Sequence, residues 1–173
     1  AAINGSGASN QPTGILNTTD IGDVVMGANG GVPTFPNIIS LETEVAVDNA
    51  DVDNMGYLLT PGMRGVFKGA ALAANNAGFI WNGTGGKSNG YNAQVSTQVP
   101  STLTKGTSTD CHAIIFGNWA DLIIANWGMV DILVNPYTKA KEGLVELVVN
   151  SFWDIGVKHP ESFSAIKDAR VAV

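Results

Sequence analysis

Charge and cysteine are both scarce in this chain. Charged residues make up 14% of the 173 residues, well below the roughly 25% that is usual for globular domains. The single cysteine, Cys111, excludes an internal disulfide framework and is compatible with a reducing compartment. Nine Lys and Arg against fifteen Asp and Glu give a net charge of -6, which argues against a nucleic-acid surface, since that needs clustered cations. The low charge favours a surface that is partly an interface.

Long apolar runs are also absent. No run approaches the ~20 residues that span a bilayer, and no charged segment followed by an apolar one opens the chain. We therefore expect no membrane partner. The chain begins at Ala1 without a Met, and we interpret it as a processed or excised fragment of a longer protein. A chain of this length buries on the order of 70% of its unfolded surface, which is enough for one large or two small domains.

Glycine, in contrast, is abundant. Thirteen of its 21 residues lie in two stretches that are also rich in Asn, Ser and Thr, 4–36 and 75–110. We expect both stretches to be irregular, and the second to offer a contact surface. Between them, apolar residues at helical spacing from Ile38 to Val45 predict an amphipathic helix that ends near Asn49.

A strand that leads directly into a helix follows. Residues 56–59 form a short apolar strand, and Thr60 and Pro61 supply an N-cap and a first-turn proline for a helix over 63–72. This is an α/β element. The later elements are an apolar strand, a short helix or second strand, and a further apolar strand, at 113–117, 118–124 and 130–134.

The last thirty residues, 143–173, carry the most information. Alternating side chains from Leu144 to Trp153 place one apolar and one mixed face on a long strand. A sharp reversal at 158–163 then predicts a returning strand, so that the two form a hairpin. An uncovered flat strand pairs with any other edge it meets, and we therefore expect this hairpin to be shared with another chain.

Reactive side chains do not form a catalytic or metal site in this sequence. Cys111 and His112 are adjacent on a strand and point to opposite faces, so that a structural role is favoured over a nucleophile. His159 has only Glu161 nearby, which is a weak case for a metal. The glycine-rich run 83–88 ends in Gly-Lys-Ser, but the spacing of a phosphate-binding loop is not met, and we expect a flexible exposed loop.

Acid pairs and tryptophans complete the candidates for chemistry. Glu42 with Glu44, and Asp51 with Asp53, are interpreted as solvated charges rather than as a glycosidase pair. The four tryptophans could line a carbohydrate groove, but each lies in an apolar run and is expected in the core; they are Trp81, Trp119, Trp127 and Trp153. We expect no enzyme activity, no catalytic residue, no cofactor and no metal.

Seven short segments, taken in order, resemble the major capsid proteins of tailed bacteriophages and prophages, of the Hong Kong 97 type. They are INGSG (3–7), QPTGIL (11–16), YLLTP (57–61), GFIW (78–81), GYNAQVS (90–96), IIFGNW (114–119) and KHPESF (158–163). Their order and spacing cover nearly the whole chain. The resemblance implies an α+β fold with a mixed sheet and flanking helices in an axial domain, and a long β-hairpin in a peripheral domain.

The resemblance also implies a division of the chain and a set of partners. A peripheral-domain segment over 1–21 would follow the spine helix, 22–128 would be the axial domain, and 129–173 would hold the peripheral-domain closing strands. The subunit would assemble with itself into pentamers and hexamers of a virion capsid, in the bacterial host cytoplasm. A scaffolding protein, a maturation protease and a portal would be further partners, and double-stranded DNA would be enclosed without specific binding.

Some members of that family link subunits through a lysine–asparagine bond assisted by a glutamate. An ungapped placement from Pro160 puts the asparagine and glutamate positions at Gly143 and Asn150, and neither fits, so that non-covalent assembly is expected. The residues expected at intersubunit contacts are Trp81, Asn82, Lys87, Asn89, His159 and Glu161. Two alternatives stay open: an encapsulin-like nanocompartment shell protein, and a secreted glycan-binding or hydrolytic domain.

Overall fold

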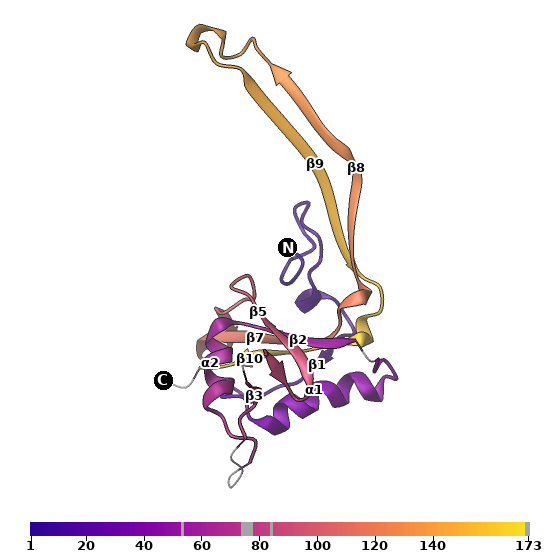
Figure 1. The fold of residues 1–173 in the computed structure, drawn as a ribbon, viewed down its shortest axis with the longest axis vertical. Coiled ribbons are helices and arrows are strands. Elements are labelled where there is room, and N and C mark those ends of the chain that lie inside the picture. The colour runs from indigo at the N-terminus through magenta and orange to yellow at the C-terminus, as the bar shows by residue number, and fades with distance from the viewer. Residues whose placement is uncertain (53, 74–77, 84, 172–173) are drawn as a thin grey trace.

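The computed structural model describes residues 1–52, 54–73, 78–83 and 85–171. In these residues the chain forms a body, built around a mixed β-sheet, and a long two-stranded hairpin that projects away from it (Figure 1). The N-terminal segment lies beside the base of the hairpin. The body and the hairpin differ in how their apolar side chains are covered, and this difference locates the candidate site.

The main sheet has the strand order β1-β10-β7-β2-β5-β4-β3, and β6 pairs with β7 outside this path. Two of its pairings, β1 with β10 and β2 with β5, are parallel, and the others are antiparallel. The strands are β1 (Gly22–Asp23), β2 (Met55–Leu59), β3 (Trp81–Asn82), β4 (Lys87–Ser88), β5 (Tyr91–Val95), β6 (Leu103–Lys105), β7 (Ser108–Asn118) and β10 (Phe163–Ala169). The expected mixed sheet is confirmed.

Two α-helices flank this sheet, α1 (Phe35–Val47) and α2 (Pro61–Gly69). The Thr60 hydroxyl accepts a hydrogen bond from the backbone N–H of Met63, at 3.2 Å, and Pro61 occupies the first turn of α2. Both features were predicted from the sequence, because an N-cap oxygen satisfies a helical N–H that has no partner within the helix. Among the described residues, no helix has the length and apolar character needed to cross a membrane.

Apolar side chains cover the sheet on both sides. On one side, Ile38 and Leu41 of α1 are buried against strands β2 and β7. On the other side lies the N-terminal segment, whose 3-10 helix η1 (Ile15–Asn17) buries Ile15 and Leu16. Successive residues of β7 join alternate clusters, with Ile114 and Phe116 in the first and Ala113 and Ile115 in the second, as the two-residue period of a strand requires.

The hairpin consists of β8 (Leu122–Asn135) and β9 (Glu146–Val157), which pair antiparallel along their whole length. Two 3-10 helices mark its base, η2 (Trp119–Asp121) and η4 (Pro160–Ser162), and a third, η3 (Ala140–Glu142), lies at its tip. The region 118–124, which the sequence leaves open between a helix and a strand, therefore contains both.

The predicted pairing of the last thirty residues is wrong. The chain does reverse at η4, but the strand before it pairs with β8, and the strand after it, β10, pairs with β7 of the main sheet. A two-residue alternation specifies which face of a strand is apolar, but it does not specify which strand lies alongside. The long hairpin is therefore formed by 122–157 and turns at its η3 tip.

Candidate assembly interface

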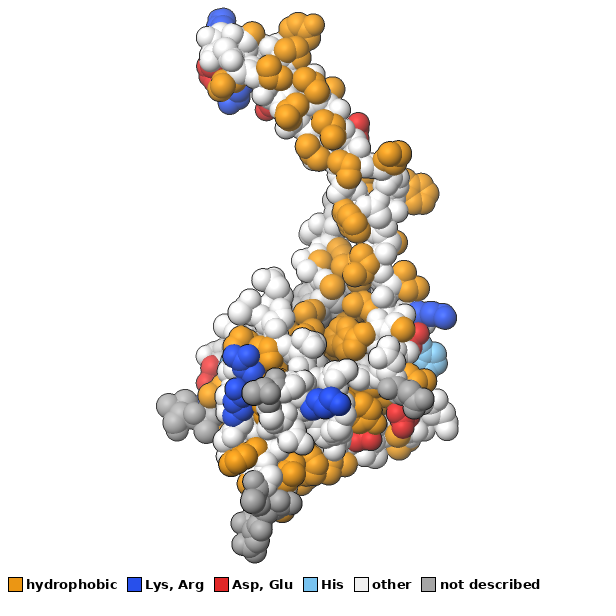
Figure 2. Space-filling model, viewed as in Figure 1, with side chains coloured by type: hydrophobic (Ala, Val, Ile, Leu, Met, Phe, Trp, Pro, Cys, Tyr) orange, Lys and Arg blue, Asp and Glu red, His pale blue; other side chains and the backbone are white. Residues whose placement is uncertain are grey.

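The hairpin exposes most of its apolar side chains. Trp127 is 83% exposed and Met129 is 92% exposed, although both residue types are ordinarily well covered. Figure 2 shows hydrophobic side chains along the whole length of the hairpin. The large apolar residues exposed there are Ile123, Ile124, Trp127, Met129, Val130, Ile132, Leu133, Val134, Tyr137, Leu144, Val145, Leu147, Val148, Val149, Phe152 and Trp153. Continuous exposed apolar surface of this kind marks an interaction site.

Two of the four tryptophans contradict their expected burial. Trp127 and Trp153, at 59%, are exposed on the hairpin, whereas Trp81 and Trp119 are partly buried in the body. The apolar runs that contain Trp127 and Trp153 form a two-stranded ribbon, which has no second layer within the described residues. The core assignment of these two side chains is therefore wrong.

The strand register divides the hairpin into two unlike faces, because cross-strand partners share a face. The charge-free face carries Leu122, Ile124, Asn126, Ile132, Val134, Leu147, Val149, Ser151, Trp153, Ile155 and Val157. The mixed face carries Ile123, Ala125, Trp127, Asp131, Leu133, Asn135, Glu146, Val148, Asn150, Phe152, Asp154 and Gly156. The contrast predicted from the sequence, one apolar face and one mixed face, is thus confirmed for β9 and extends to β8.

A bulge interrupts the hairpin midway. Between the pairs Trp127–Phe152 and Asp131–Asn150, three residues of β8 lie opposite Ser151 alone. The first of them, Gly128, has a φ of +75°, a left-handed conformation that glycine adopts without strain. The hairpin bends about halfway along its length in Figure 1.

The tip and the base of the hairpin are held by local hydrogen bonds. At the tip, the Asn135 side-chain oxygen accepts from the N–H groups of Tyr137 and Thr138, at 3.0 and 3.3 Å. At the base, the indole N–H of Trp119 donates to the Gly56 carbonyl of β2 at 3.0 Å, and its ring packs edge-on against Phe163. The hairpin is therefore anchored to the main sheet rather than attached by a loose linker.

The first group of predicted contact residues lies at the far edge of the main sheet. Trp81 and Asn82 form β3, Lys87 begins β4, and Asn89 follows in the turn to β5. The Asn89 amide donates to the Glu42 carboxylate of α1 at 2.5 Å, so that it already has a partner within the subunit.

The second group lies at the base of the hairpin. His159 Nδ1 is 3.3 Å from a carboxylate oxygen of Glu161, and both side chains are about half exposed. This group immediately precedes β10, which β7, β2, β5 and β4 separate from β3. The structure therefore does not bring the two groups together, and neither includes the hairpin surface. The apolar runs at 122–124 and 130–134 were the signal for that surface.

The reactive side chains at 111 and 112 lie on β7 of the main sheet. Cys111 is fully buried and His112 is half-buried, as expected for neighbours on opposite faces of β7. Within the described part of the chain, no three His, Cys, Asp or Glu residues group in a way that could hold a metal ion. Asp53, which was paired with Asp51 in the sequence, lies outside the described residues.

Two expectations about loops and charges need correction. The run 83–88 was expected to be a flexible exposed loop, but its end forms β4, where Ser88 is fully buried. Glu42 was expected to be a solvated charge, but its carboxylate also accepts from the Tyr91 hydroxyl at 3.0 Å. Ser88 pairs with β3 and β5 within a few residues of the loop, whereas Glu42 is bonded by a residue 49 positions away, which the local sequence does not show.

Comparison with known proteins identifies the family. The model of the Phage capsid family matches residues 1–168. A major capsid protein of Halomonas phage phiHAP-1 is 32% identical over 161 residues, which are 92% of this chain and 24% of that protein. This chain therefore spans about a quarter of the length of that relative.

Solved structures share the fold at low sequence identity. The capsid of a native GTA particle superposes with a TM-score of 0.70 at 17% identity, over 98% of this chain and 60% of that chain. A chain from Gordonia phage Cozz gives 0.60 at 16% identity, over 96% and 55%. The SrpI encapsulin of Synechococcus elongatus PCC 7942 gives 0.59 at 15% identity, over 93% and 58%. The expected Hong Kong 97-like fold is confirmed, and the chain belongs to the phage capsid family.

Proposed function

We propose that this chain is the shell-forming part of a capsid subunit that assembles with copies of itself into the pentamers and hexamers of an icosahedral phage or prophage head. The observation that carries the proposal is the hairpin β8–β9, which exposes apolar side chains on both faces in a chain of the phage capsid family. Repeated contacts between identical subunits give a closed shell when each subunit presents the same complementary surfaces.

The magnitudes support contacts along the whole hairpin. Fully burying one Leu, Phe or Met side chain stabilises by about 1.5–3 kcal/mol, whereas association costs about 4–15 kcal/mol in lost freedom of motion. One covered side chain is therefore too little to hold two subunits together. The row of exposed apolar side chains on the hairpin can exceed this cost, provided that most of its length is covered.

The charge-free face and the mixed face suit different neighbours. The charge-free face has no charged side chain that would lose its hydration, which favours an interface from which water is excluded. The second carries Asp131, Glu146 and Asp154, whose burial would cost several kcal/mol each without a cationic partner. We propose that the charge-free face is the one buried most completely in the assembled shell.

A nanocompartment shell is the second candidate. The encapsulin and the Gordonia phage chain superpose almost equally well, with TM-scores of 0.59 and 0.60, so the fold does not separate the two functions. The 32% identity to a phage major capsid protein favours the phage head. The contents of purified shells, DNA or an enzyme cargo, would distinguish them.

A glycan-binding domain has little support in the geometry. Its strongest feature would be a platform of exposed tryptophans, but Trp127 lies on the mixed face of the hairpin and Trp153 on the charge-free face. The two rings therefore cannot stack on one sugar chain. A structural role without enzymatic activity fits the family membership better.

The finer parts of the proposal extend beyond the chain itself. They include a virion location after assembly in the host cytoplasm, enclosure of double-stranded DNA, and contacts with a scaffolding protein, a maturation protease and a portal. Contacts at Trp81, Asn82, Lys87, Asn89, His159 and Glu161 are also proposed. We also propose the division into 1–21, 22–128 and 129–173. In this division, β9 of the hairpin and β10 of the main sheet both belong to 129–173.

The test is assembly of the full-length parent protein, followed by electron microscopy and sedimentation. Wild type is compared with Ile132→Lys on the charge-free face, and with Val47→Lys, a matched apolar-to-lysine change at an exposed position of α1. We expect closed shells or capsomer rings from wild type and Val47→Lys, and no shells from Ile132→Lys. Normal shells from Ile132→Lys would contradict the role of the charge-free face, and a wild type that is always monomeric would contradict the function.

A further inference from the structure

His112 of β7 joins the main sheet to the first turn of α2. Its Nδ1 atom lies 2.8 Å from the hydroxyl oxygen of Thr60, the N-cap of that helix. The same hydroxyl oxygen accepts from the N–H of Met63 at 3.2 Å. The ring also packs against Gly62: a Cβ added there would be 3.1 Å from the Cε1 atom of His112, and equally close to Val171.

The protonation state of the imidazole decides whether this arrangement is satisfied. When Nδ1 is unprotonated, the Thr60 hydroxyl donates its proton to Nδ1 and accepts from Met63, so that both roles of the hydroxyl are used. When Nδ1 carries a proton, both neighbours donate to Thr60, and the hydroxyl proton has to find another acceptor. Thr60 is 1% exposed, so water does not supply one.

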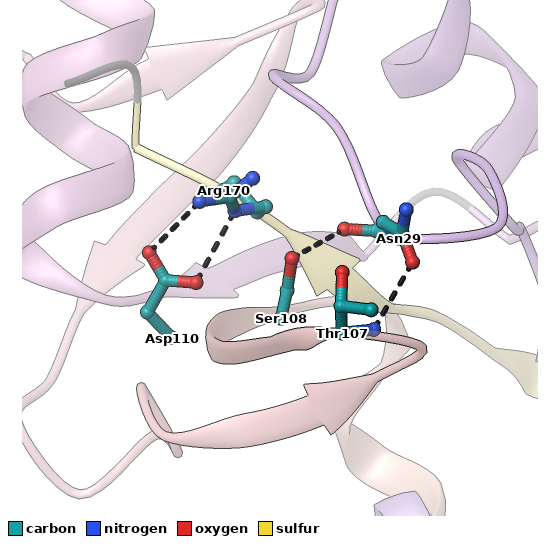
Figure 3. Close-up of polar contacts among 5 residues, drawn as sticks. All are labelled: Asn29, Thr107, Ser108, Asp110 and Arg170. Atoms are coloured by element: carbon teal, nitrogen blue, oxygen red, sulfur yellow. Dashed lines mark hydrogen bonds and ion pairs between the residues drawn. The ribbon is translucent and has the colours of Figure 1, made fainter.

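Electrostatics acts in the same direction. A protonated His112 would place a positive charge at the N-terminus of α2, which is the positive end of the helix dipole. The Asp110 carboxylate on the same strand acts on the ring, and it pairs with Arg170 after β10 at 3.2 Å (Figure 3). At the start of α2 the ring meets the uncharged Thr60 and Gly62.

In the described strands beside β7, no charged residue is in register with His112. On β10 the residue in register with His112 is Ala169, and Lys105 of β6 is in register with Ser108 instead. Burial lowers the pKa of His112 below its usual range, and the nearby Asp110 carboxylate only partly opposes this effect. The neutral imidazole is therefore the form that the folded body favours.

We propose that His112 and Thr60 form a pH-sensitive latch, which holds the first turn of α2 on the main sheet while the imidazole is neutral and releases it when the imidazole is protonated. Gly62 lies close to both the ring and Val171, so release would loosen both the start of α2 and the segment after β10. The latch lies in the body, and its test does not depend on shell assembly.

The test uses hydrogen exchange and mass spectrometry on the full-length protein. Exchange at the imidazole Cε1–H gives the pKa of His112. Backbone exchange of peptides spanning 60–68, corrected for intrinsic rates, reports the opening of α2. We expect a His112 pKa below 6.5 and a protection of this peptide that falls roughly threefold to tenfold from pH 7.5 to pH 5.5, since one pKa unit corresponds to about a tenfold change in an opening equilibrium.

Variants distinguish the latch from a non-specific effect of low pH on the stability of α2. His112→Asn keeps an acceptor near the Nδ1 position but cannot take up a proton, and we expect its peptide to stay protected at both pH values. Thr60→Ser keeps the hydroxyl and should keep the pH dependence, whereas Thr60→Val should raise the pKa of His112 towards its usual value. An equal loss of protection in wild type and His112→Asn, or a His112 pKa unchanged by Thr60→Val, would overturn the proposal.

Discussion

The body and the hairpin are built from the same kinds of strand residues, but the body buries its apolar side chains and the hairpin exposes them. Ile114 and Phe116 of β7 are fully buried, because β10 and β2 flank the strand and apolar side chains cover both of its faces. Ile132 and Phe152 of the hairpin are 60% and 66% exposed. Their two strands pair only with each other, and no layer of the described chain covers them. The comparison teaches that an apolar strand is a core element only where another layer covers it.

The largest expected difference between the two regions comes from one matched pair of truncations. Phe116→Ala should lower the free energy of unfolding by about 3–5 kcal/mol, because it leaves a cavity in the body. Phe152→Ala should change it by less than about 1 kcal/mol in the unassembled chain, since that ring is mostly in water. Urea unfolding of both variants measures the contrast. A large loss of stability in Phe152→Ala would show that the hairpin is covered within the subunit.

At the edge of the main sheet, we expect one truncation to raise the free energy of unfolding, by less than Phe116→Ala lowers it. The Ser88 hydroxyl oxygen is buried, and the part of the chain that the structure describes gives it no hydrogen-bond partner. Because an unsatisfied buried polar group costs about 1–3 kcal/mol, Ser88→Ala should stabilise the body by about 1 kcal/mol. Thermal and urea unfolding would detect this gain, and Ser101→Ala at an exposed position is the matched control, expected to be neutral. A destabilised Ser88→Ala would mean that the hydroxyl has a partner.

The smallest expected effect is a dependence of stability on pH, confined to the body. The folded pKa of His112 lies below its unfolded value, so the unfolded chain binds the proton more readily. The contribution of the neutral imidazole is therefore complete above about pH 6.5 and is lost as the pH falls through 6.5 towards the folded pKa. Unfolding of wild type and His112→Asn across pH 5 to 8 measures it. A pH dependence of equal size in both proteins would assign the effect to other groups.

A second titration acts at lower pH and has the usual sign for a carboxylate. The Arg170 guanidinium hydrogen-bonded to Asp110 holds the pKa of that carboxyl below its ordinary value. The pair therefore stabilises the folded state above the unfolded pKa, near 3.9, and this contribution is lost as the pH falls through the folded pKa. Figure 3 shows that the same region ties Asn29 to Thr107 and Ser108, so that one cluster joins the loop before α1, the start of β7 and the end of β10.

Local rules predicted many of the elements correctly. The spacing from Ile38 to Val45, the cap at Thr60 and the alternation from Leu144 to Trp153 each depend on side chains close together in the sequence. A helical or two-residue period, and an N-cap hydroxyl, act over a few residues, and they are therefore readable without the fold.

Long-range contacts decided the features that local rules missed. Asn89 and Tyr91 reach Glu42 across 47 and 49 residues of sequence, and they change an expected solvated acid into a bonded one. Trp127 and Trp153 were expected in a core because their neighbours are apolar, but burial depends on what lies above a strand rather than beside it in the chain.

Short-range patterns in the sequence are enough to predict the α+β composition, the helix capped by Thr60, the apolar and mixed faces of β9, and the resemblance to phage capsid proteins. The pairing of β9 with β8, the return of β10 to β7 and the exposure of the apolar hairpin surface follow from long-range contacts, which those patterns do not contain. Strand partners are chosen by the free energy of the whole sheet, since a strand of suitable alternation can pair with any edge that buries its apolar face.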